Sequence, residues 1–102
     1  MKIELLCEGN PSWKKEAIDD IKAALEELKL EYEIEFEVIE DYKGKPVLKI
    51  DGNDVAYVQR GECVGNRHYF FKTDEEYYYD AKELVTKFIK DRIEEVEMED
   101  LA

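Results

Sequence analysis

The chain has 102 residues, enough for one domain with one core. Hydrophobic residues make up 44% and charged residues 41%, which is the composition of a globular protein with a highly charged surface. Its net charge of −12 argues against nucleic acids and anionic membrane surfaces as partners, because both are bound by clustered Lys and Arg. No apolar run approaches the roughly 20 residues that span a bilayer and no signal peptide is recognisable, so we expect a cytoplasmic protein.

The first third of the chain predicts a strand followed by a helix. Residues 2–7 are apolar enough for a central strand, and Gly9 ends it. Asn10 is a preferred N-cap residue and Pro11 suits the first helical position, so a helix is expected over residues 11–29. The apolar positions of this segment recur at helical spacing: Ala17, Ile18, Ile21, Ala24, Leu25 and Leu28.

The middle of the chain predicts three more strands. Residues 32–38 alternate strictly between apolar side chains and glutamates, which is typical of a strand with one buried face. Residues 46–50 and 55–58 are apolar runs on either side of the Asp51-Gly52 turn. Because both turn residues tolerate positive φ, this pattern indicates a hairpin.

The last third is dominated by a long helical pattern. Residues 67–72 predict either a fifth strand or a segment that covers one end of the sheet, and residues 73–76 have the form of a helix capping box. The acidic tail, 97–102, is expected to fray, and residues 1–102 to form a single domain. The apolar positions that predict the helix are Tyr77, Ala81, Leu84, Val85, Phe88, Ile89, Ile93 and Val96.

Two motifs and the order of elements resemble the small thioredoxin-like and glutaredoxin-like proteins. Residues 10–13, Asn-Pro-Ser-Trp, stand after the first strand, where that family carries Cys-Pro-x-Cys, and residues 44–52 are similar to the segment in which a cis-proline, here Pro46, starts the third strand. The resemblance implies a thioredoxin-like α/β fold with a central mixed sheet of four or five strands and two main helices, in the order β-α-β-β-β-α. A ferredoxin-like sandwich, with a different strand order, is the alternative.

The same motif argues against the chemistry of that family. Disulfide exchange needs a thiolate at a helix N-terminus and a resolving thiol one turn later, but Asn10 and Trp13 occupy those positions. We therefore expect a redox-inactive binding domain for a protein or peptide partner. In the family, backbone beside the cis-proline pairs with an extended substrate segment, and Trp13 could serve as an apolar platform or pack against the loop. The implied groove is formed by Asn10, Pro11, Trp13, Lys45, Pro46, Gly61 and Cys63.

The two cysteines leave an enzymatic alternative open. Cys7 ends an apolar strand, which predicts a buried and inert thiol. Cys63 falls in a turn that the resemblance places beside the start of the first helix, so it is the candidate catalytic residue of a single-thiol redox enzyme. The spacing of the two cysteines and the one histidine, His68, matches no zinc site, and we expect neither a metal nor a cofactor.

Six aromatic residues fall within eleven positions near residues 69–79. Neighbouring side chains cannot all point inward on a strand or a helix, so some are expected to be partly exposed. Tyrosine is favoured at interfaces, and a homodimer or partner surface is one explanation; packing of the helix onto the sheet is the other. The candidate interface residues are Tyr69, Phe71, Tyr78 and Tyr79.

Overall fold

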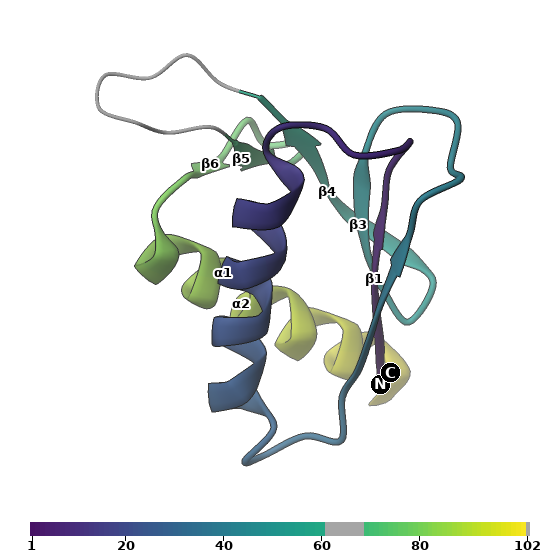
Figure 1. Ribbon diagram of the computed structural model, residues 1–102. Coiled ribbons are helices and arrows are strands. Elements are labelled where there is room, and N and C mark those ends of the chain that lie inside the picture. Colours follow the sequence, from purple (N-terminus) through teal and green to yellow (C-terminus); the bar gives the residue numbers. More distant parts are fainter. Residues whose placement is uncertain (61–68, 102) are drawn as a thin grey trace.

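The computed structural model describes residues 1–60 and 69–101, and over these ranges two helices cover one face of a six-stranded mixed sheet (Figure 1). The α/β class and the two main helices are confirmed, whereas the prediction of four or five strands is wrong. The elements in chain order are β1 (Lys2–Leu6), α1 (Lys14–Leu28), β2 (Glu35–Ile39), β3 (Val47–Ile50), β4 (Asn53–Gln59), β5 (Phe70–Lys72), β6 (Tyr78–Tyr79) and α2 (Lys82–Leu101).

The strands are arranged in the order β2-β1-β3-β4-β5-β6. β1 and β2 run parallel, because α1 carries the chain back across the sheet between them, and every other neighbouring pair is antiparallel. β1 therefore lies inside the sheet between β2 and β3, as expected for a central strand. No helix in the described part of the chain is long and apolar enough to cross a membrane.

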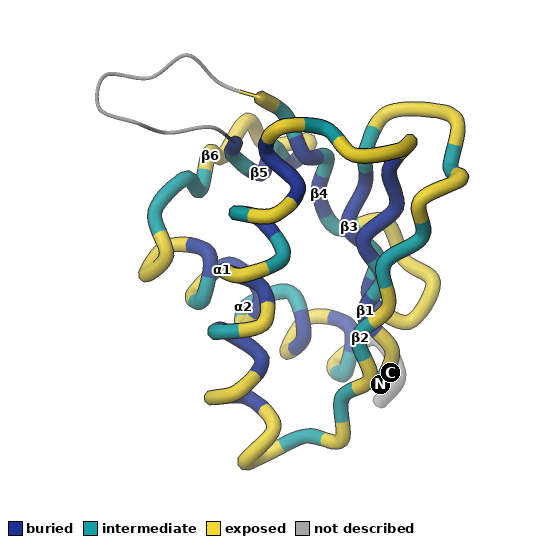
Figure 2. The backbone as a smooth tube through the Cα atoms, in the orientation of Figure 1, coloured by how far each residue is buried: buried dark blue, intermediate teal, exposed yellow. Residues whose placement is uncertain are grey.

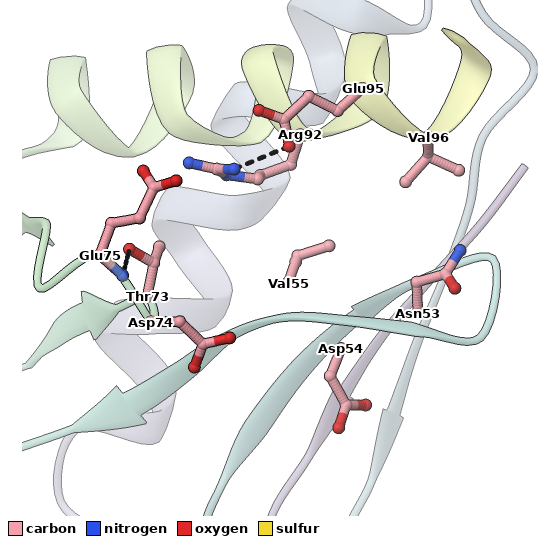
Figure 3. A pocket seen from close by; sticks show the side chains of 9 residues that line it. All are labelled: Asn53, Asp54, Val55, Thr73, Asp74, Glu75, Arg92, Glu95 and Val96. Carbon is pink, nitrogen blue, oxygen red and sulfur yellow. Dashed lines mark hydrogen bonds and ion pairs between the residues drawn. The ribbon is translucent and has the colours of Figure 1, made fainter. Parts of the chain in front are cut away.

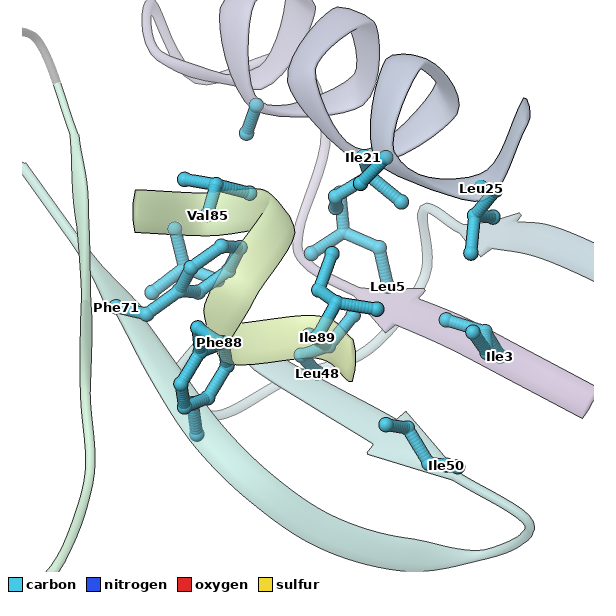
Figure 4. Close-up of a cluster of buried hydrophobic side chains, with 14 of the residues drawn as sticks. Ile3, Leu5, Ile21, Leu25, Leu48, Ile50, Phe71, Val85, Phe88 and Ile89 are labelled. Carbon is cyan, nitrogen blue, oxygen red and sulfur yellow. The ribbon is translucent and has the colours of Figure 1, made fainter. Parts of the chain in front are cut away.

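Alternate side chains of the strands form the core beneath the two helices. Ile3 and Leu5 of β1 lie opposite Ile50 and Leu48 of β3, and all four are fully buried. Figure 4 shows them facing side chains from both helices. Burial of this apolar surface is the main force that holds the helices on the sheet. The helix side chains labelled there are Ile21, Leu25, Val85, Phe88 and Ile89.

The opposite face of the sheet carries no helix in the described part of the chain, and its side chains differ in polarity along the strands. Glu4 pairs with Lys49, while Leu6 pairs with Val47 and both of these are buried. The two outer strands are β2, whose glutamates are exposed, and the two-residue β6 (Figure 2 shows the exposure along the backbone). This face is solvated at its charged positions, as antiparallel sheets commonly are.

Helix α1 begins at Lys14, three residues later than predicted. Residues 11–13 form a turn in which the Lys14 N–H donates to the Pro11 carbonyl at 3.1 Å. Trp13 is the N-cap and makes no side-chain capping bond. The predicted cap, Asn10, instead accepts a hydrogen bond from the Lys14 side chain at 2.9 Å. The side chain of Lys14, itself anchored to Glu40, has taken the capping oxygen, which helix propensities do not anticipate.

The segment predicted as a capping box is a turn between two strands. The Thr73 hydroxyl accepts a hydrogen bond from the Glu75 N–H at 3.3 Å, but the next element is strand β6 and not a helix. Glu76 turns the chain with a φ of 63°, and Tyr78–Tyr79 then pair with β5. Aromatic residues favour strands, and the edge of β5 is available for Tyr78 and Tyr79 to pair with.

The two remaining predictions for the C-terminal third have clear outcomes. Residues 67–72 were predicted to form either a strand or a segment that covers one end of the sheet, and Phe70–Lys72 forms strand β5. Arg67 and His68 lie outside the described residues. Helix α2 begins at Lys82 and continues to Leu101, so the segment expected to fray from residue 97 is helical as far as 101.

Candidate functional site

The corner between β1 and α1, where the resembled family has its thiols, is organised around the buried Lys14. Its ammonium donates to the Gly9 carbonyl at 3.2 Å, to Asn10 Oδ1 at 2.9 Å and to Glu40 Oε1 at 2.5 Å. An ammonium has three protons, so each has an acceptor. The Lys14 side chain is 7% exposed and that of Glu40 63%, so the cation is buried while its counter-charge meets solvent.

Backbone hydrogen bonds pin the same corner to the segment after β2. The Cys7 N–H donates to the Ile39 carbonyl and the Gly9 N–H to the Glu40 carbonyl, both at 2.9 Å. Gly9 has a φ of 66°, a conformation that glycine adopts without strain. The first bond continues the parallel β1–β2 pairing, whereas the second belongs to an antiparallel bridge between Glu8 and Asp41, and together they fix the position of Glu40 over Lys14.

A hollow of about 400 Å³ opens beside this corner, and we call it the corner hollow. Asn10 is exposed and Pro11 half-buried at its rim. Trp13 does not reach it, because the indole is 5% exposed and packs in the core. The buried indole offers no exposed platform, and it packs in the core cluster, a different contact from the packing against the loop that was the alternative. The lining residues are Asn10, Pro11, Lys14, Lys15, Ile18, Asp19 and Glu40.

The other predicted groove residues do not join this hollow. The peptide bond before Pro46 is trans, so the cis-proline implied by the resemblance is absent. Lys45 is exposed, with its ammonium 5.7 Å from the ring centroid of Tyr57. Gly61 and Cys63 lie outside the described residues. Of the seven predicted binding residues, the structure brings together Asn10 and Pro11.

Cys7 lies directly behind the corner and is fully buried. Its thiol faces the Gly9 carbonyl at 3.9 Å, a weak sulfur hydrogen bond. Burial raises the pKa of the thiol; the nearby Lys14 charge opposes this rise and the Glu40 charge adds to it. A high pKa and no access to solvent make an inert thiol, as predicted. Among the described residues, no cluster of His, Cys, Asp and Glu could hold a metal ion.

Two of the four predicted interface residues belong to the core. Phe71 is fully buried and stacks on Phe88 with ring centroids 5.3 Å apart, and Tyr69 is 1% exposed and meets Phe71 edge-on. Both side chains are buried in the core, Phe71 against α2 and Tyr69 with its hydroxyl toward α1, so neither presents the surface that the interface prediction requires. Tyr79 is half-buried against Phe88, while Tyr78 is 51% exposed on the uncovered face of the sheet.

The hydroxyl of buried Tyr69 donates a hydrogen bond to the Asp20 carboxylate of α1. Burial raises the pKa of this tyrosine, and the bond to Asp20 raises it further. The hydroxyl therefore stays protonated and serves as a structural donor that ties the start of β5 to α1. Sequence analysis missed Asp20 because its position in the helix is that of an ordinary solvated charge.

A second hollow, which sequence analysis also missed, lies between α2 and the sheet (Figure 3). It measures about 330 Å³, and we call it the Arg92 cavity. β4 contributes through a bulge: Leu48 pairs with Ala56 and Lys49 with Asp54, so Val55 is the extra residue. A bulge re-aims side chains. The lining residues are Asn53, Asp54, Val55, Thr73, Asp74, Glu75, Arg92, Glu95 and Val96.

Arg92 is held in place on two sides. Its Nη1 lies 2.7 Å from Glu95 Oε2, and its guanidinium lies 5.3 Å from the ring centroid of Phe88. Its Nε is buried and has no hydrogen-bond partner within the described residues. An unsatisfied buried donor costs about 1–3 kcal/mol, so this nitrogen is the chemically unusual atom of the cavity.

Comparison of the chain with protein-family models, with curated protein sequences and with solved structures finds no match in any of the three.

Proposed function

We propose that this chain is a redox-inactive, thioredoxin-like binding domain, and that the corner hollow receives a side chain of a peptide segment of a protein partner. The strand order supports the fold. β1 lies between parallel β2 and antiparallel β3, and β4 follows as a hairpin. In a ferredoxin-like sandwich, β2 and β3 would form a hairpin, but here β1 separates them.

The buried Lys14 ammonium is the observation that carries the proposal. It stands at the helix start, where a redox protein of this fold needs thiols, and uses all three protons to hold Gly9, Asn10 and Glu40. A charged amine with its protons engaged is not a nucleophile. The nearest described thiol, that of Cys7, is buried. Among the described residues, the corner therefore has the rigidity of a binding surface and no reactive group.

The lining of the corner hollow suits an apolar side chain flanked by polar contacts. Pro11 and Ile18 are partly exposed and apolar, whereas Asn10, Lys15 and Asp19 are exposed and polar. Binding pockets combine an apolar lining with a few polar groups that fix orientation. A peptide that places one aliphatic or aromatic side chain against Pro11 and Ile18 matches this arrangement.

Peptide selection tests the proposal. A displayed random-peptide library is selected on the purified protein, and the tightest peptide is titrated while amide NMR shifts are followed. We expect saturable shifts around Pro11 and Ile18, and at least tenfold weaker binding to Lys15→Glu. Lys22→Glu, an exposed lysine of the same helix outside the hollow, is the matched control and should bind as the parent does. Shifts that map elsewhere, or equal losses in both variants, would refute the site.

The absence of thiol chemistry at the corner has its own test. In a Cys63→Ser variant, Cys7 is expected to react with a neutral-pH alkylating reagent only as fast as the protein opens, because its thiol is buried and its pKa is raised. Labelling should accelerate by several orders of magnitude in denaturing urea. Rapid labelling of the folded variant below pH 7 would contradict the redox-inactive assignment.

The uncovered sheet face supports a second candidate function, assembly with another copy of the chain. Tyr78 is half exposed there and meets Phe70 at 5.0 Å. Elsewhere on the same face Lys2 pairs with Glu37 and Lys49 with Asp54, so these four charges balance one another. Sedimentation over a concentration series distinguishes the cases: association that Tyr78→Ser abolishes supports assembly, and a monomer at all concentrations rejects it.

A further inference from the structure

Strand β2 is the outermost strand at one side of the sheet, and one of its two edges is free. It pairs with β1 alone, and the described residues place no strand on its other side (Figure 1). Glu35 and Ile39 direct backbone groups toward β1, through hydrogen bonds of 2.9 Å to residues 1 and 7. Because the backbone groups of successive strand residues point to alternate sides, those of Phe36 and Val38 point to the free edge. Each of these two residues offers one donor and one acceptor to a further strand.

The two faces beside this edge differ in chemistry. Phe36 lies opposite Ile3 of the core, so the side chains of residues 36 and 38 are on the helix side of the sheet, where both are half-buried. Glu35 and Glu37 alternate with them, lie on the uncovered face and are exposed. A strand that pairs here therefore presents alternate side chains to α1 and to the glutamates.

A hollow of about 260 Å³ lies between α1 and β2 on the helix side. Its apolar lining comes from Phe36 and Leu25, and its charged lining from the exposed Lys22, Glu26 and Lys29. The volume is below the roughly 300 Å³ at which small-molecule pockets begin, so the hollow suits one side chain rather than a whole ligand. An aliphatic side chain from a paired strand would cover the exposed part of the Phe36 ring.

The uncovered face beside the edge favours a cation. Glu37 is paired with Lys2 at 2.9 Å, but Glu35 has no partner at salt-bridge distance in the described residues. Glu4 is the direct neighbour of Glu37, and the lysine on its other side, Lys49, forms an ion pair of its own. The hydrogen bond and charge of Glu37 raise the pKa of Lys2, and the charges of Glu4 and Glu35 raise it further. The same carboxylates would stabilise an additional positive charge.

We propose that β2 binds an extended basic segment of a protein partner as an additional strand, with aliphatic side chains toward α1 and basic side chains toward Glu35 and Glu37. Main-chain hydrogen bonds supply the affinity of such a complex, and alternate side chains supply its specificity. A second copy of this chain fits poorly, because its own β2 would bring glutamates to the same place. The site goes beyond the proposed function, since the α1–β2 hollow and the corner hollow share no lining residue.

The test uses a five-residue peptide of alternating lysine and valine, blocked at both ends. Its pattern is the same in both directions, so it fits β2 in either orientation. It is titrated into the protein labelled with ¹⁵N at low salt, and amide shifts and amide exchange are followed. We expect saturable shifts at residues 35–39, and at least tenfold slower exchange of the Phe36 and Val38 amides, because their N–H groups gain acceptors. A matched peptide with glutamate in place of lysine should bind at least tenfold more weakly.

N-methylation separates strand pairing from simple charge attraction. One peptide is methylated on its valine nitrogens and another on its lysine nitrogens. A strand turns only one of these two sets of N–H groups toward its neighbour, so one methylated peptide should lose binding at least tenfold while the other keeps it. The peptide that loses binding also reveals whether the added strand is parallel or antiparallel to β2.

Three variants complete the test. Glu35→Gln should weaken binding at least threefold, and Glu83→Gln, at an exposed position of α2, is the matched control. Lys15→Glu, which alters the corner hollow, should not weaken binding here, so this proposal and the proposed function fail separately. The proposal is overturned if both methylated peptides behave alike, if the glutamate peptide binds as tightly, if the shifts map elsewhere, or if Glu35→Gln and Glu83→Gln lose binding equally.

Discussion

At the scale of single residues, the two ion partners at the corner are not equivalent. Lys14 is buried and Glu40 is mostly exposed, so the free energy of the pair depends on which side chain is removed. Without Lys14, the Glu40 carboxylate turns to water. Without Glu40, the ammonium keeps two neutral acceptors and stays buried. Removing one partner of a buried charge is costly because the other stays behind.

We predict that Glu40→Ala lowers the free energy of unfolding by about 1–2 kcal/mol, and that Lys14→Met, which keeps the buried aliphatic stem, costs less than about 1 kcal/mol. Urea unfolding of the two variants and the parent measures the difference. The control is Glu37→Ala, whose partner Lys2 is 48% exposed; it should change stability by less than about 0.5 kcal/mol. The reverse order of Glu40→Ala and Lys14→Met would contradict this account of the corner.

Tyr69 gives a prediction about alkaline pH. An unfolded tyrosine loses its proton near pH 10, but burial, and then the bond to Asp20, raise the pKa of Tyr69 in the folded protein. Above pH 10 the unfolded state therefore binds fewer protons. The contribution of Tyr69 is complete below pH 10 and falls above it, by up to about 1.4 kcal/mol per pH unit.

Urea unfolding at several values between pH 8 and pH 11 checks this slope. Tyr69→Phe should flatten the alkaline loss of stability, whereas Tyr78→Phe, at a half-exposed position, should leave it as in the parent. Equal slopes in the parent and in Tyr69→Phe would show that Tyr69 does not carry the effect.

At the scale of elements, the sequence pattern predicted those helices and strands whose formation depends on the periodicity and turn residues of their own segment. The body of α1, the alternating β2 and the β3–β4 hairpin follow directly from periodicity and from the Asp51-Gly52 turn. The errors fall where a side-chain contact or a strand edge competes with the local pattern. Asn10 was expected to cap α1 but binds Lys14, and the turn at Thr73 continues into β6 because β5 offers an edge.

The hairpin turn carries a prediction for Gly52. Its φ is 81° and a Cβ built on it would meet nothing within 4 Å, so the cost of a side chain is conformational alone. Gly52→Ala should lower the free energy of unfolding by about 1 kcal/mol, from the left-handed backbone that L-residues disfavour. Thermal and urea unfolding measure it, with Lys43→Ala in an exposed loop as the control. No loss in Gly52→Ala would mean that the turn relaxes to another geometry.

The candidate sites were harder to predict than the elements. The corner hollow is formed by residues 10–19 and Glu40, and its location was indicated by the strand-to-helix motif. The Arg92 cavity draws on β4, the turn after β5 and α2, which are far apart in the sequence. Arg92 has the pattern of a surface helical charge. Neither the bulge at Val55 nor an Nε without a partner among the described residues can be recognised in a residue pattern.

At the scale of the whole molecule, net charge and size together determine the response to salt. The radius of gyration is 13.0 Å and the net charge is −12, so like charges lie within a screening length at low ionic strength. The Debye length is about 30 Å at 0.01 M salt and below 10 Å above 0.15 M. Self-repulsion therefore destabilises the fold in dilute buffer.

We predict that raising NaCl from about 10 mM to about 500 mM increases the Tm by several degrees, because screening of repulsion outweighs loss of the few exposed ion pairs. Thermal melts followed by circular dichroism measure it. The double variant Glu27→Lys/Glu94→Lys, at two exposed positions, brings the net charge from −12 to −8 and should respond less. A Tm that falls with salt would show that ion pairing dominates.

The outer strands of the sheet have a consequence for how this protein behaves at high concentration. An open sheet invites further strands at its margins, and such growth leads toward fibrils. Here one margin, β2, presents Glu35 and Glu37, and the other, β6, is two residues long. An incoming strand would meet carboxylates on one side and too short a template on the other. The charge of β2 and the shortness of β6 thereby disfavour edge-to-edge pairing of sheets from different molecules.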